Sequence, residues 1–66
     1  MAWVCVNSGG VELIFGTEPH KVAYSWRDNE GSCRCIALPN GSIKKLIGRE
    51  LTWEDEPVEV FVNLDD

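Results

Sequence analysis

The chain has 66 residues, of which 44% are hydrophobic and three are tryptophan, and its formal net charge is −5. This length allows a single domain (1–66), and the hydrophobic content excludes an intrinsically disordered protein. The acidic balance argues against direct nucleic-acid binding, which requires a basic face. No run approaches the ~20 apolar residues of a membrane helix, and the start of the chain lacks a secretory signal. We therefore expect a cytoplasmic protein that does not bind membranes.

The first half of the chain predicts two β-hairpins. Residues 3–6 are aromatic or β-branched and place apolar side chains on both faces of a strand. The paired glycines within residues 7–10 suit a tight turn, and residues 11–15 alternate apolar and polar side chains at period two. Residues 22–26 alternate in the same way, with apolar residues again at 33–38. The sequence predicts that these last two segments pair as a second hairpin with a longer loop.

One short helix is expected at 42–47. Ser42 is a candidate N-cap, and Gly48 is a natural stop at the C-terminal end. Three apolar residues within the segment share one helix face and should dock on a sheet, because so short a helix is not stable alone. These residues are Ile43, Leu46 and Ile47.

The remaining apolar segments add strands and define the fold class. Residues 49–53 and 58–62 both read as strands, separated by an acidic turn that contains a proline. Five to six short strands with one helical turn predict a mainly β fold. It is expected to be either a small curved antiparallel sheet or a partly open barrel of SH3-like or OB-like type.

Three cysteines and one histidine raise the question of metal or redox chemistry. Cys33 and Cys35 lie on the same side of a predicted strand, with one residue between them. Zinc-binding cysteines are usually separated by two to four residues, so the spacing favours buried core thiols over a zinc site. The alternative is a small zinc module that uses Cys5, His20, Cys33 and Cys35. A disulfide from Cys5 to one of the other two cysteines requires that their strands be neighbours. The favoured interpretation has no metal and no cofactor.

Nothing in the sequence indicates catalysis. His20 is placed in a loop, and no nucleophile, orienting acid or glycine-rich phosphate loop accompanies it. We therefore predict that the protein is not an enzyme.

The C-terminal third carries the most distinctive surface chemistry. From Glu50 to the end there are seven acidic residues and no basic one. Trp53 directly precedes three of these acids, and an indole beside carboxylates suits contact with Lys or Arg of another protein. The alternative is an ordinary solvated acidic face, with Trp53 covering the edge of the core. The predicted partner-binding residues are Trp53, Glu54, Asp55, Glu56, Glu50 and Glu59.

The stretch IKKLIGRELTWEDEPVEV, residues 43–60, resembles the tail of short uncharacterised proteins from gut bacteria and their mobile elements. The resemblance covers about a third of the chain and implies a small accessory protein of bacterial or phage type. Together with the acidic surface it predicts a non-enzymatic protein-interaction module, one form of which is an inhibitor that mimics nucleic-acid charge. The competing hypotheses are the zinc module and a structural subunit that forms homo-oligomers through strand edges.

Overall fold

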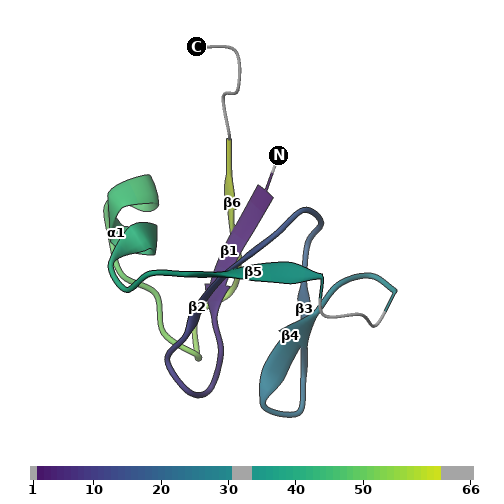
Figure 1. Cartoon of the computed structure of the whole chain (residues 1–66). Helices are drawn as coiled ribbons and strands as arrows, with labels where there is room; N and C mark the ends of the chain where they lie inside the picture. Colours follow the sequence, from purple (N-terminus) through teal and green to yellow (C-terminus); the bar gives the residue numbers. More distant parts are fainter. Residues whose placement is uncertain (1, 31–33, 62–66) are drawn as a thin grey trace.

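The computed structural model describes residues 2–30 and 34–61, and these residues form a mainly β protein. This confirms the predicted fold class, and the single short helix begins and ends at the predicted residues. The elements are β1 (Ala2–Val6), β2 (Glu12–Phe15), β3 (His20–Val22), β4 (Ser25–Arg27), β5 (Cys35–Leu38), α1 (Ser42–Ile47) and β6 (Val58–Val60) (Figure 1).

The strands form two antiparallel sheets that do not close into a barrel. Four strands pair in the order β5-β2-β1-β6, and β3 and β4 form a separate two-stranded sheet. The open-sheet form of the prediction is therefore correct. The predicted first hairpin is confirmed as β1 and β2, in which Cys5 lies opposite Leu13.

β1 is apolar on both faces because it lies between two separate hydrophobic clusters. On one face, α1 and Leu51 pack against the sheet, and on the other face Trp26 of β4 covers it. Figure 1 shows α1 on one side of the sheet and the β3–β4 hairpin on the other. The buried residues of the first cluster are Ala2, Val4, Val6, Ile43, Leu51 and Val60. Those of the second cluster are Cys5, Leu13, Phe15 and Trp26.

The predicted second hairpin is wrong. The segment 22–26 does not form one strand, because the chain reverses at Ala23 and Tyr24 and pairs β3 with β4. Ala23 has a φ of 54°, a left-handed conformation that is uncommon for a residue other than glycine. Larger and smaller side chains continue to alternate through this turn, so the sequence pattern does not indicate where the chain reverses. β5 pairs with β2 instead, which places Ile36 opposite Ile14.

Several smaller expectations also need correction. Residues 49–53 form no strand, and His20 lies at the start of β3 rather than in a loop. Val11 lies before β2 and is exposed, because the turn of the hairpin extends to it. Leu46 is exposed on α1, so only Ile43 and Ile47 of the predicted triad dock on the sheet. β6 ends at Val60. The predicted strands also include Cys33 and Val62, which lie outside the described residues.

Candidate functional site

Residues 52–55 form a tight turn, in which Asp55 has a structural role that Glu54 and Glu56 do not share. The Asp55 carboxylate accepts hydrogen bonds from the Thr52 amide at 2.7 Å and the Thr52 hydroxyl at 3.2 Å. The Thr52 carbonyl in turn accepts from the Asp55 amide at 3.1 Å. Asp55 therefore holds the turn closed and is half-buried. Glu54 and Glu56 lie on either side of it with exposed side chains.

A second loop, distant in the sequence, lies beside this turn. Glu18 lines the same hollow of about 280 Å³ as Glu54 and Glu56. Pro19 follows Glu18 and Pro57 follows Glu56, and both prolines line the hollow and restrict the backbone beside these two acids. The basic residues His20 and Lys21 also line it. No ion pair within residues 2–30 and 34–61 involves any of the three glutamates. We call these residues (Glu18, Glu54 and Glu56) the acidic hollow.

Trp53 lines a different hollow from the three glutamates, and its indole is in contact with side chains of its own chain. Its ring meets that of Trp26 edge-to-face, with 5.7 Å between centroids. The Lys21 ammonium lies 4.1 Å from the Trp53 ring centroid and 5.4 Å from that of Trp26. A basic group of the same chain therefore lies against this indole, whereas the predicted contact with Lys or Arg of another protein stays a prediction. Trp53 is half-buried, packs against the second cluster, and so also covers the edge of the core.

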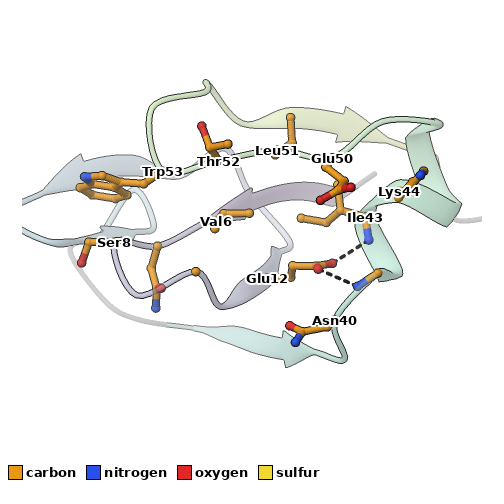
Figure 2. A pocket seen from close by; sticks show the side chains of 13 residues that line it. Val6, Ser8, Glu12, Asn40, Ile43, Lys44, Glu50, Leu51, Thr52 and Trp53 are labelled. Atoms are coloured by element: carbon orange, nitrogen blue, oxygen red, sulfur yellow. Dashed lines mark hydrogen bonds between the residues drawn. The ribbon is translucent and has the colours of Figure 1, made fainter.

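The other two predicted residues lie apart from the acidic hollow. Glu50 lines a different hollow, of about 530 Å³, between α1 and the β1–β2 turn (Figure 2). Glu59 is exposed on β6, opposite Trp3 of β1. The structure thus gathers Glu54, Asp55 and Glu56 at the acidic hollow. It places Trp53 and Glu50 together at the other hollow and leaves Glu59 outside both. Sequence reasoning missed Glu18, because the packing that brings residues 18–21 beside residues 54–57 has no local signal.

Glu12 has a structural role that sequence analysis did not reveal. Its carboxylate accepts hydrogen bonds from the amides of Gly41 at 2.7 Å and Ile43 at 2.8 Å (Figure 2). These amides belong to the first turn of α1, which lacks intrahelical partners for them. The predicted N-cap is therefore wrong: Gly41 occupies the cap position with φ 91°, and Glu12 of β2 supplies the capping oxygens. Ser42 instead donates its hydroxyl to the Pro39 carbonyl at 2.7 Å.

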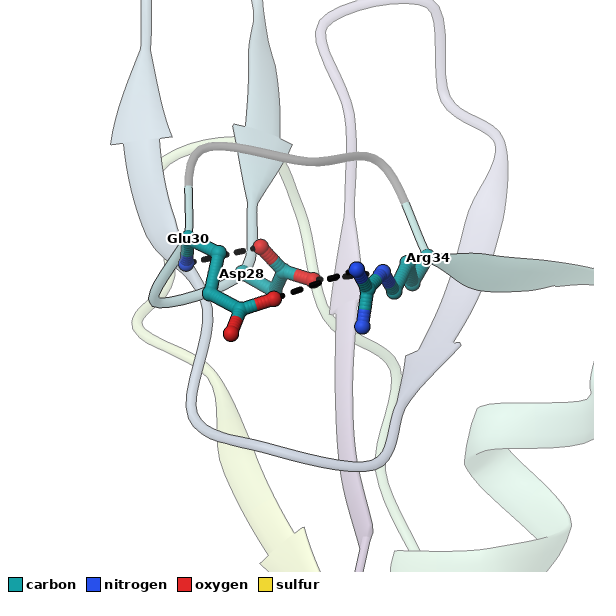
Figure 3. A network of polar contacts seen from close by, with 3 residues as sticks. All are labelled: Asp28, Glu30 and Arg34. Carbon is teal, nitrogen blue, oxygen red and sulfur yellow. Dashed lines mark hydrogen bonds and ion pairs between the residues drawn. The ribbon is translucent and has the colours of Figure 1, made fainter.

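A second charged group joins the end of the β3–β4 hairpin to the start of β5 (Figure 3). The Arg34 guanidinium lies 3.1 Å from the Glu30 carboxylate and 3.9 Å from that of Asp28. The buried Asp28 carboxylate also accepts a hydrogen bond from the Glu30 amide at 2.9 Å. The Arg34 side chain is 73% exposed, so we expect its ion pairs to contribute little to the free energy of unfolding. Their main effect is to orient the start of β5 relative to the end of the β3–β4 hairpin.

The cysteines that the structure describes belong to the second cluster. Burial, and to a lesser extent the nearby Cys35, raises the pKa of the Cys5 thiol to about 12, so this thiol is protonated at neutral pH. The condition for a disulfide between Cys5 and Cys35 is not met, because β2 separates their strands and two strand spacings of ~4.8 Å exceed the ~7 Å limit between Cα atoms. Within residues 2–30 and 34–61 no three His, Cys, Asp or Glu side chains gather in a metal-binding group. Cys33 is outside that range.

Comparison with known proteins assigns no family to this arrangement. No family model matches the chain, and neither the curated proteins nor the solved structures contain a match. Among the described residues, no helix is long and apolar enough to cross a bilayer.

Proposed function

We propose that this chain is a non-enzymatic protein-interaction module that binds a basic segment of another protein at the acidic hollow. The observation that carries the proposal is the meeting of Glu18 with Glu54 and Glu56 around one depression, without an ion pair to any of them in the part of the chain that the structure describes. Three carboxylates that line one depression present a negative potential there, which a Lys or Arg side chain of a partner would meet.

The neighbouring aromatic rings favour a cationic ligand over a simple counterion. Lys21 shows that the faces of Trp53 and Trp26 accept an ammonium group in this environment. Because Lys21 already lies against these rings, a basic peptide that crosses the hollow would place its own charges against the carboxylates. In this proposal Glu50 and Glu59 extend the negative potential on either side and speed encounter without touching the bound segment.

One specific form of the proposal is an inhibitor that occupies the nucleic-acid groove of a basic protein. The acidic hollow supports this form because it presents several negative charges on a surface held by a hydrogen-bonded turn. In that case, DNA and this protein would compete for the same basic target, and both interactions would weaken as salt concentration rises.

The test is a fluorescence titration with hexa-arginine, because Trp26 lines the hollow and is in contact with Trp53. The double variant Glu54→Gln with Glu56→Gln should weaken binding about fivefold, as expected for two exposed ion pairs. The matched control, Glu50→Gln with Glu59→Gln, removes the same charge away from the hollow and should change affinity less than about twofold.

Equal weakening in the two double variants would show that only net charge matters, and would contradict a localised site. An affinity that does not change with salt, or no binding at low salt, would also contradict the proposal. The thermal midpoint of each variant should be measured first, so that loss of binding is not confused with loss of folding.

A further inference from the structure

Asn40 and Gly41 form a dipeptide whose side chain and backbone are able to react with each other. Asparagine is a thermolabile residue, and a following glycine, which has no Cβ atom, leaves the intervening peptide free to rotate. The chain also has asparagine at positions 7, 29 and 63, but only Asn40 precedes a glycine. The Asn40 side chain is exposed and lines the hollow of about 530 Å³ (Figure 2).

Asn40 and Gly41 occupy the two central positions of a β-turn that leads into α1. The Ser42 amide donates to the Pro39 carbonyl at 3.1 Å and closes this turn. Gly41 has φ 91° and ψ −4°, and Asn40 does not have a positive φ, so the turn is of type II. The residue before the glycine of a type II turn has ψ near about 120°. This value places the Gly41 nitrogen away from the Asn40 side chain, and the peptide must rotate before the two groups meet.

Glu12 holds this peptide in its unreactive orientation. The carboxylate accepts hydrogen bonds from the Gly41 amide at 2.7 Å and from the Ile43 amide at 2.8 Å. The Gly41 bond must break before the peptide rotates. The same carboxylate opposes loss of the Gly41 amide proton, because the resulting anionic nitrogen would form beside a negative charge.

We propose that Asn40 is a deamidation site that Glu12 protects in the folded chain. When the turn opens, the Gly41 nitrogen attacks the Cγ atom of Asn40 and the Cγ–Nδ2 bond breaks. Ammonia leaves with the former Gly41 amide proton, and a cyclic imide forms. Water then adds to one of the two imide carbonyls and breaks its bond to the ring nitrogen, which gives aspartate or isoaspartate. In total one water enters and one ammonia leaves.

The reaction would change the hollow and the start of α1. Either product adds a carboxylate to a hollow that Glu12 and Glu50 already line. Isoaspartate also carries the main chain through its Cβ atom, which lengthens the turn by one atom and shifts the amides of Gly41 and Ile43 relative to Glu12. We therefore expect deamidation to loosen α1, which buries Ile43 against the sheet.

The test is incubation of the intact chain at mildly alkaline pH, followed by peptide mapping with mass spectrometry to measure conversion at Asn40. Conversion should be at least about tenfold slower in the folded chain than in the chain unfolded in guanidinium chloride. Glu12→Ala should speed conversion in the folded state about tenfold, the factor that corresponds to one hydrogen bond to a charged group. Asn29, which is exposed and precedes Glu30, is the internal reference and should convert slowly throughout.

Trp26→Phe is the matched control, because it destabilises the second cluster and leaves the Glu12 contacts in place. It should change conversion at Asn40 by less than about twofold, since local opening of the turn exposes the site without global unfolding. Glu12→Gln keeps one acceptor oxygen and should give an intermediate rate, which is informative even if Glu12→Ala does not fold. Asn40→Ser should abolish the signal. Far-UV circular dichroism confirms that each variant is folded.

Three results would overturn the proposal. One is an equal rate at Asn40 in the folded and the unfolded chain, which would show that the turn gives no protection. Another is an unchanged rate in Glu12→Gln and Glu12→Ala. The third is equal acceleration by Trp26→Phe and Glu12→Ala, which would show that global unfolding, and not the Glu12 contact, controls the reaction.

Discussion

Replacing Glu12 should destabilise the protein far more than its position on a partly exposed strand implies. The carboxylate accepts two short hydrogen bonds from the first turn of α1, at 2.7 and 2.8 Å. Glu12→Ala leaves the amides of Gly41 and Ile43 without these acceptors. Loss of an N-cap costs about 0.5–2 kcal/mol and loss of a hydrogen bond to a charged group about 1.5–3 kcal/mol. Since the Gly41 bond is exposed, we expect a total near 2 kcal/mol.

That loss is large for a chain of this size. At ~0.05–0.15 kcal/mol per residue, the free energy of unfolding is about 3–10 kcal/mol, and a loss of 2 kcal/mol lowers the melting temperature by roughly 8–16 °C. Urea unfolding followed by tryptophan fluorescence measures the loss directly. Glu12→Gln keeps one acceptor oxygen and should lose about half as much. Glu50→Ala, an exposed acid, should change stability by less than about 0.5 kcal/mol. If Glu12→Ala and Glu50→Ala are equivalent, the capping argument is refuted.

Three further predictions concern the turn and the second cluster. Ala23→Gly should stabilise the protein by about 0.5–1 kcal/mol in the same urea assay, because glycine adopts positive φ without strain; a destabilised variant would contradict this. Trp26→Phe removes the indole that donates to the Val6 carbonyl at 2.8 Å and should cost about 1–3 kcal/mol, and a cost under 0.5 kcal/mol would refute that role. Cys5 has a raised pKa, so its stabilising effect is complete below the unfolded-state pKa of 9.0. That effect is lost as pH rises toward 12. Urea midpoints measured from pH 8 to 11 should fall less steeply in Cys5→Ala, and identical slopes would contradict the assignment.

Local patterns predicted the parts of the fold that local physics determines. The glycines at 9 and 10 located the first hairpin, and the spacing of Ile43 and Ile47 located the face of α1 that docks on the sheet. Gly48 ends the helix as expected, with φ 82° and its amide donating to the Lys44 carbonyl at 2.9 Å. Each of these features needs only a few consecutive residues, and for that reason the sequence revealed them.

The failures share a different cause. Ala23 turns the chain without glycine or asparagine at that position, and it does so beside a backbone contact in which the Ser8 hydroxyl donates to the Tyr24 carbonyl at 2.8 Å. The acidic hollow likewise depends on Glu18, which is 36 positions from Glu54. Both features arise from contacts between distant segments. The spacing of apolar residues and their secondary-structure propensities carry no information about such contacts.

A strand that is apolar on both faces is poorly protected against slippage. Sliding β1 by one position would exchange the side chains of Val4 and Cys5 between the two clusters, and hydrophobicity alone would scarcely oppose the exchange. The alignment must then be selected by polar anchors at the strand ends. The indole of Trp26 donates a hydrogen bond to the Val6 carbonyl at the end of β1. Glu12, at the start of β2, accepts a hydrogen bond from the Gly41 amide at the N-terminal end of α1. Misaligned, aggregation-prone forms should therefore accumulate when these anchors are removed, even in variants that leave every buried aliphatic side chain in place.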